Sequence, residues 1–116
     1  METLSAFLFR RLAESGVTCT FGIPGDFAIP IYAGQAQAGM RTVVCAHEPG
    51  AAFAADAYAR MRGLGVAVAT YGAGALNMAN PLAMSYAEHT PVLLISGAPE
   101  THARALVHHT VKNCDS

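Results

Sequence analysis

The stretch "RTVVCAHEPGAAFAADAYARMRGLGVAVATY", residues 41–71, decides the fold of this 116-residue chain. Its first residues are β-branched and apolar, which predicts a strand over 41–46. Pro49 suits the first turn of a helix, which we expect to run to about Met61. The segment 65–71 is apolar almost throughout, as is typical of a strand covered on both faces. The order strand, helix, strand predicts two parallel strands joined by a helix.

The residues on either side of this stretch extend the same alternation. Helical spacing of apolar residues, β-branched runs and glycine-containing turns predict further helices over 3–15, 27–37 and 75–88, further strands within 17–25 and over 91–97, and a loop from 98 to the end. The strand over 91–97 is apolar, so we expect it to be buried like the strand over 65–71. Short connections and uninterrupted apolar strands predict an α/β fold. We expect a doubly wound, mainly parallel sheet with helices on both faces, built as one domain over residues 1–116.

Composition limits the classes of function. The chain is 53% hydrophobic and 13% charged, well under the usual quarter of charged residues. A domain of this size buries only about two-thirds of its surface, so we expect part of the apolar surface to face another domain or subunit. The net charge of −1, with scattered basic residues, argues against a nucleic-acid or anionic membrane partner.

Cysteine usage and hydropathy indicate the compartment. Three cysteines without a CxxC spacing disfavour a disulfide framework or a zinc site, and they favour a reduced, cytoplasmic environment. The segment 64–87 has no charged residue, which is long enough to raise the question of a membrane span. Glycine, asparagine and proline residues interrupt it, so we predict a strand and a helix there and no membrane span.

Polar residues follow the predicted strands at the carboxyl edge of the sheet. In doubly wound sheets this edge is where ligands bind. The polar residues that gather there are Asp26 after the first strand, Glu48 after the second, Thr70 and Asn77 around the third, and His108 and His109 beyond the fourth. Their common placement predicts a functional site at this edge.

Each candidate also has a structural interpretation, and the residues alone leave both open. Glu48 is expected to lie among small and apolar neighbours. It can complement a helix dipole, worth about 0.3–1 kcal/mol, or share a proton with a ligand nitrogen. Asp26 can cap the following helix. His108 and His109 can be a solvated loop pair or a proton shuttle near neutral pH.

The Gly72-x-Gly74 turn is a second ambiguous signal. A GxG between strand and helix can bind a dinucleotide, but Asn77 stands where that fingerprint needs Gly or Ala. The sequence therefore favours a tight strand-to-helix turn at this place.

Several stretches together resemble one family. They are "FGIPGDF", "HEPGAAFAADAYAR", "TYGAGALN", "SYAEHTPVLLISGAP" and "VHHT". Over about residues 3–112 the chain resembles the N-terminal, pyrimidine-binding domain of thiamine-diphosphate-dependent 2-oxo acid decarboxylases. The combination of "PGDF" with "HH" is similar to the pyruvate, indolepyruvate and phenylpyruvate decarboxylase branch, with an aromatic or indolic substrate slightly favoured.

The resemblance implies a role for each candidate. Glu48 matches the glutamate that hydrogen-bonds N1′ of the cofactor's aminopyrimidine and so promotes removal of the thiazolium C2 proton. Asp26 and the histidine pair match residues that handle the substrate and protonate intermediates. The residues that match turns approaching the pyrimidine ring are Pro24, Thr70 and Asn77.

The resemblance also implies partners. The cofactor is thiamine diphosphate, and its Mg²⁺ site lies on a separate diphosphate-binding domain. The Gly-Asp-Gly…Asn signature of that domain does not occur in these residues, so we expect no metal site on this chain. A 2-oxo acid substrate, a diphosphate-binding domain or chain, and assembly into a dimer or tetramer follow from the same likeness.

Several interpretations of the chain remain open at this point. It can be a fragment of a longer decarboxylase, one chain of a split enzyme, or a non-catalytic relic, and we expect these 116 residues alone to be inactive. An acetolactate synthase-like carboligase fragment and a non-catalytic α/β binding or assembly module are the alternative functions.

Overall fold

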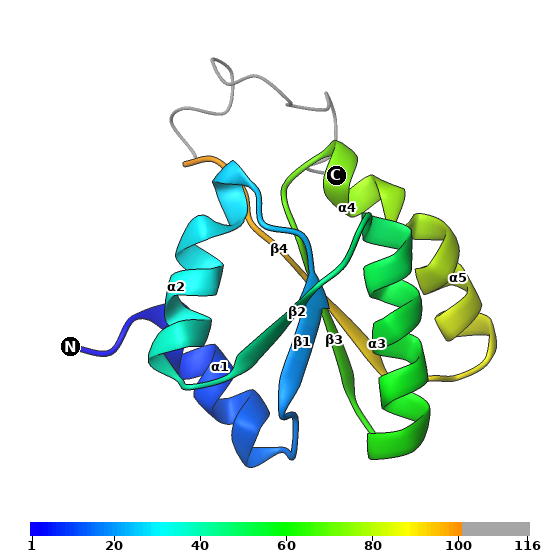
Figure 1. Cartoon of the computed structure of the whole chain (residues 1–116), viewed down its shortest axis with the longest axis horizontal. Helices are drawn as coiled ribbons and strands as arrows, with labels where there is room; N and C mark the ends of the chain where they lie inside the picture. The colour runs from blue at the N-terminus through cyan, green and yellow to red at the C-terminus, as the bar shows by residue number, and fades with distance from the viewer. Residues whose placement is uncertain (101–116) are drawn as a thin grey trace.

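The computed structural model describes residues 1–100 of the protein. They form a four-stranded parallel sheet in the order β2-β1-β3-β4 (Figure 1). The strands are β1 (Cys19–Gly22), β2 (Arg41–Val44), β3 (Gly65–Ala69) and β4 (Val92–Ser96). Each predicted strand is present, shortened at one or both ends.

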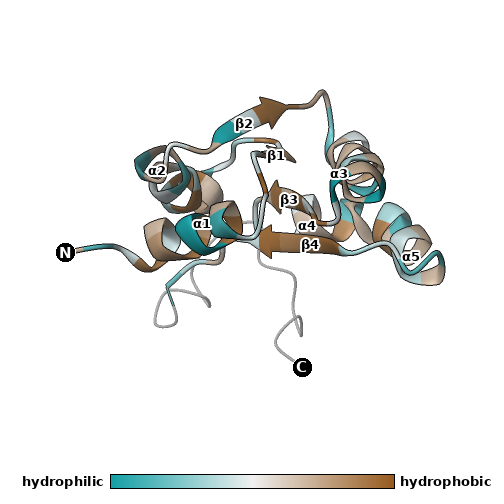
Figure 2. Cartoon of the chain, turned by 90° about the horizontal axis from the view of Figure 1, so that it is seen from below, coloured by the Kyte–Doolittle hydropathy of each residue, from teal (hydrophilic) through white to brown (hydrophobic). Residues whose placement is uncertain are grey.

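Helices cover both faces of the sheet. Seen along the sheet in Figure 2, α1 and α2 lie on one side, whereas α3, α4 and α5 lie on the other. Their bounds are α1 (Leu4–Glu14), η1 (Asp26–Ala28, a short 3₁₀ helix), α2 (Ile29–Gln37), α3 (Glu48–Arg62), α4 (Ala73–Asn77) and α5 (Ala79–Ala87). This arrangement confirms the predicted doubly wound α/β fold. Within residues 1–100 there is no helix with the length and hydrophobicity of a membrane span.

Local sequence signals explain where the helices begin and end. The Thr3 hydroxyl caps α1 by accepting a hydrogen bond from the Ala6 amide at 3.2 Å, as N-cap threonines do. Pro49 occupies the first turn of α3, where its missing N–H costs nothing. Gly63 ends α3 with φ +96°, a left-handed conformation that favours glycine.

Two sequence predictions were wrong in detail. The single helix expected over 75–88 is divided at Met78 into α4 and α5. The side chain of Met78 is fully buried at this break, in the cluster formed by the alanines of α3 and β3. The last strand was expected to be buried, but β4 has exposed and half-buried residues because it is an edge strand of the described sheet.

Small residues form the contact between α3 and the sheet. Ala51, Ala52 and Ala55 of α3 pack with the alanines of β3 in one buried cluster. A methyl group added at Gly65 would overlap the carbonyl oxygen of Ala55. The helix therefore lies unusually close to β3, all five residues of which are buried.

A buried glutamine ties the opposite face together. Gln35, only 1% exposed, accepts a hydrogen bond from the Thr20 hydroxyl at 3.0 Å. Its amide group donates to the Met40 carbonyl oxygen at 3.3 Å and to the Thr42 hydroxyl at 2.7 Å. These bonds join α2 to β1 and β2 and satisfy a polar group that would be costly to bury alone.

A second polar cluster joins α3 to α5. The Asp56 carboxylate, 4% exposed, accepts hydrogen bonds from Arg60 Nε at 2.7 Å and from the Ser85 hydroxyl at 2.8 Å. The hydrogen bond from Arg60 is the main reason why the pKa of Asp56 lies below its usual value. The two helices are thereby held in a fixed position beside each other.

Candidate functional site

The site lies at the carboxyl ends of β1 and β3, which are neighbours in the sheet. The chain leaves β1 toward α2 on one face and leaves β3 toward α4 on the other (Figures 1 and 2). Such a reversal opens a crevice in doubly wound sheets. A cavity of about 230 Å³ is found there, lined by Gly25, Asp26, Phe27, Thr70 and Tyr71.

Thr70 is enclosed by two glycine turns. A methyl group on Gly25 would lie 2.8 Å from Thr70 Cβ, and a methyl group on Gly74 would lie 2.8 Å from Thr70 Cγ2. Both separations are too short for non-bonded carbon atoms. The turn after β1 and the start of α4 therefore approach Thr70 only because both positions are glycine.

The Glu48 side chain extends from the start of α3 toward Gly74, beside Thr70. Its Oε2 accepts a hydrogen bond from Asn77 Nδ2 at 3.0 Å. Its Oε1 lies 3.5 Å from where a methyl group on Gly74 would be, and it has no hydrogen-bond partner within residues 1–100. The carboxylate thus keeps one acceptor oxygen open beside the Thr70 turn.

The surroundings of Glu48 differ from the sequence expectation. The alanines that follow it predicted a carboxylate among apolar neighbours, but the residue is half-buried and its bond to Asn77 is solvent-exposed. Ala51, Ala52 and Ala55 pack against the sheet instead. Glu48 still lies in the first turn, where its charge complements the helix dipole.

The other predicted residues lie around the same crevice. Asp26 is exposed and lines the cavity of about 230 Å³. It does not cap the helix, since the N-cap of η1 is Gly25 and no side-chain cap bond forms. Pro24 is exposed in the same turn. His108 and His109 fall outside the described residues.

The backbone conformation explains why residue 72 is a glycine. Gly72 has φ +68°, so the GxG sequence serves a tight strand-to-helix turn, as the sequence favoured.

An aromatic pair was missed by the sequence reasoning. The rings of Phe27 and Tyr71 meet edge to face, with centroids 6.4 Å apart and planes at 87°. Tyr71 comes two residues after the end of β3, so its place at the carboxyl edge was a signal that could have identified it. The pair joins the two turns that form the crevice.

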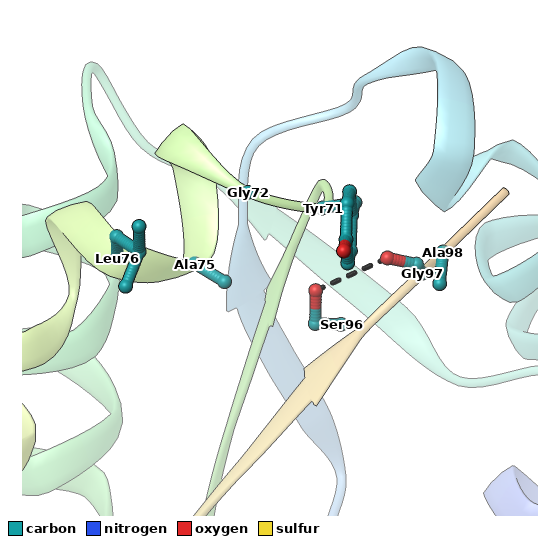
Figure 3. Close-up of a pocket in the computed structure, with 7 residues that line it drawn as sticks. All are labelled: Tyr71, Gly72, Ala75, Leu76, Ser96, Gly97 and Ala98. Atoms are coloured by element: carbon teal, nitrogen blue, oxygen red, sulfur yellow. Dashed lines mark hydrogen bonds between the residues drawn. The ribbon is translucent and has the colours of Figure 1, made fainter. Parts of the chain in front are cut away.

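Tyr71 also lines a second cavity of about 360 Å³, between the start of α4 and the end of β4 (Figure 3). Its wall is largely apolar, and its remaining lining residues are Gly72, Ala75, Leu76, Ser96, Gly97 and Ala98. The Ser96 hydroxyl donates to the Gly97 carbonyl oxygen at 3.2 Å. The crevice is therefore continued toward β4 by an apolar hollow.

Comparison with known proteins identifies the family. Residues 2–116 match the family described as "Thiamine pyrophosphate enzyme, N-terminal TPP binding domain". The chain is 46% identical over 118 residues to indole-3-pyruvate decarboxylase of Azospirillum brasilense, covering 97% of this chain and 22% of that protein.

Two further relatives are similar at the same level. Pyruvate decarboxylase isozyme 3 of Saccharomyces cerevisiae and alpha-keto-acid decarboxylase of Mycobacterium leprae are each 44% identical over 117 residues, with 97% of this chain and 21% of each relative covered. The chain thus spans about a fifth of the length of these curated relatives. With a family match over nearly every residue, the chain belongs to the thiamine pyrophosphate enzymes, as their N-terminal TPP-binding domain.

Proposed function

We propose that this chain is the pyrimidine-binding part of a non-oxidative 2-oxo acid decarboxylase that produces an aldehyde and carbon dioxide. The relatives that support this are named for decarboxylation of indole-3-pyruvate, pyruvate and alpha-keto acids. The single observation that carries the proposal is the open Oε1 of Glu48 beside the glycine-lined turn at Thr70.

The residues present fit an aminopyrimidine ring. Such a ring carries nitrogen atoms at its edge, and a carboxylate oxygen without a protein partner is a suitable acceptor or proton donor for one of them. The absence of a side chain at Gly25 and Gly74 lets both turns pack directly against Thr70, so that Thr70, the two turns and Glu48 lie close together at one edge of the sheet. We therefore assign Glu48 to the ring nitrogen N1′, and the turns at Pro24 and Thr70 to the ring's surroundings.

Thiamine diphosphate, when bound, would supply the electron sink that stabilises the negative charge formed as carbon dioxide leaves. The part played by this chain is to hold the ring and to move protons. Glu48 keeps a proton at or near N1′, which a carboxylate can do when a partner covers the crevice and excludes water. Asp26 lines the adjoining cavity, and we assign it to proton transfer at the substrate. The family likeness supports the same role for the His108–His109 pair.

The complete site needs a partner. Large apolar side chains remain exposed on the described part of the chain, among them Phe53 and Met61 on α3 and Leu76 on α4. We propose that a diphosphate-binding domain, carrying the Mg²⁺ site, covers the crevice, and that the enzyme works as a dimer or tetramer. The cytoplasm is the proposed compartment, in keeping with the free thiols of Cys19 and Cys45.

The proposal is tested by Glu48→Gln in the full-length protein loaded with thiamine diphosphate and Mg²⁺. The amide keeps the shape of the side chain but cannot take up or give a proton to the ring in the same way. We expect decarboxylation of pyruvate, indole-3-pyruvate and phenylpyruvate to fall by about 100-fold or more, in the range of lost acid–base catalysis. The matched control is Glu14→Gln, at an exposed carboxylate of α1, which should keep full activity.

Two outcomes would count against the proposal. Unchanged decarboxylation in a folded Glu48→Gln variant would remove the assigned role of the carboxylate. Full turnover in His108→Ala and His109→Ala, together with acetolactate formation from pyruvate, would favour the acetolactate synthase-like carboligase instead.

A further inference from the structure

Asn77, the last residue of α4, forms a hydrogen bond with the Glu48 carboxylate. Its Nδ2 donates to Glu48 Oε2 at 3.0 Å, across 29 positions of the sequence. We propose that Asn77 is a positioning residue, which fixes one oxygen of Glu48 so that the other faces the cofactor ring. This inference rests on the proposed function, since it concerns the orientation of the group that the ring would meet.

The backbone that carries Asn77 is firmly anchored. The next residue, Met78, is fully buried in the alanine cluster between α3 and β3. The Met78 amide donates to the Ala75 carbonyl oxygen at 3.0 Å, and the Ala75 amide donates to the Thr70 carbonyl oxygen at 3.1 Å. The Asn77 amide is thereby held at a set place relative to both α3 and the end of β3.

This anchoring matters because a glutamate side chain has three rotatable bonds. On an exposed helix start the carboxylate of Glu48 would sample several rotamers. One hydrogen bond to Oε2 restricts it and leaves Oε1 on the side of Gly74, 3.5 Å from that residue's missing methyl position. An amide NH₂ is a neutral donor, so it orients the carboxylate and takes no proton from it.

The break between α4 and α5 separates Asn77 from Asn80. A continuous helix over 75–88 would carry Asn77 and Asn80 on one surface, three residues apart. In the structure Asn77 ends α4, and Asn80 lies exposed in α5 with no side-chain hydrogen bond within residues 1–100. Asn80 is therefore the natural matched control.

The test is a double-mutant cycle in the full-length protein loaded with thiamine diphosphate and Mg²⁺. The measured quantity is the rate at which the cofactor's C2 proton exchanges with deuterium, followed by quenching and proton NMR. We expect Asn77→Ala to slow exchange by about 10- to 100-fold, the effect of a displacement of about 1 Å at a reacting group. Asn80→Ala should leave the rate unchanged.

The cycle distinguishes a failure of this inference from a failure of the proposed function. Exchange that is normal in Glu48→Gln would overturn the proposed function itself. If Glu48→Gln is slow but Asn77→Ala is normal, only the positioning role is refuted. The role predicts that adding Asn77→Ala to Glu48→Gln changes the rate less than about 2-fold, because the group it orients is already disabled. Fully additive effects would also refute it.

A cofactor-free readout separates positioning from folding. We expect a crystal structure of Asn77→Ala to show the Glu48 carboxylate in a new or split orientation, with an unchanged α3 backbone. Asn77→Asp, which has the same shape but cannot donate an amide proton, should turn the carboxylate away and slow exchange as well. An unmoved carboxylate in both variants would show that the bond holds nothing in place.

Discussion

Replacing Gly74 by alanine tests whether the site owes its dimensions to a missing methyl group. The added carbon would lie 2.8 Å from Thr70 Cγ2. Carbon atoms prefer separations of about 3.5–4.0 Å, so α4 or the Thr70 side chain must move by roughly 0.7–1.2 Å.

The expected cost combines two opposing effects. Overpacking of this kind costs about 1–3 kcal/mol, whereas alanine in a helix gains up to about 1 kcal/mol over glycine. We therefore expect Gly74→Ala to lower the free energy of unfolding by about 0–2 kcal/mol. Because α4 also carries Asn77, the same movement should slow turnover by up to about 100-fold.

The assay is urea unfolding followed by circular dichroism, with turnover measured in parallel on the loaded full-length protein. Thr70→Ser removes the methyl group that is struck, so the double variant Gly74→Ala/Thr70→Ser should regain most of the lost stability. Gly50→Ala is the control within a helix, since its new methyl group meets only the exposed His47 ring, at 3.3 Å. Purely additive effects of Gly74→Ala and Thr70→Ser would refute the steric argument.

The remaining predictions concern the two buried polar clusters. Gln35→Ala should lower the free energy of unfolding by about 2–4 kcal/mol, from three hydrogen bonds of about 1 kcal/mol each, whereas the exposed Gln37→Ala should change it by less than about 0.5 kcal/mol; equal effects in chemical denaturation would contradict the buried network. The pKa of Asp56 is lowered in the folded state by the bond from Arg60, so its contribution is fully present above the unfolded value of about 3.9 and is lost as pH falls through the lower folded value. Asp56→Asn should therefore flatten the acid limb of a stability–pH curve, and an unaltered limb would show that this carboxylate is not responsible.

The sequence predicted the layout of the fold because that layout depends on local patterns. Apolar runs and turn residues located four strands, and their order followed from the alternation with helices. The burial of each strand was harder to predict. Strand β4 is partly exposed because it lies at the edge of the described sheet. The break at Met78 goes together with the packing of this side chain against the alanines of α3 and β3, a tertiary contact that helical periodicity cannot predict.

The candidate site was predictable in location but not in its contacts. Placing Asp26, Glu48 and Thr70 at strand ends was sufficient to bring them to one edge. The bond between Asn77 and Glu48 and the pairing of Phe27 with Tyr71 join segments far apart in the sequence. Such contacts depend on the exact distance between helix and sheet, which cannot be predicted from residue types alone.

The distance between α3 and the sheet should also respond to substitutions far from the site. Helix α3 has 15 residues and so is about 22 Å long, and its alanine face extends from Ala51 to Ala59, roughly 16 Å beyond Glu48. Packed on small residues, the helix behaves as a stiff lever with the carboxylate at one end. Ala59 is buried against the start of β3, so we expect a larger side chain there to tilt the helix and move the Glu48 carboxylate. Substitutions at Ala59 should therefore alter the position of Glu48 from the far end of α3, and variants selected for altered rates should include changes there.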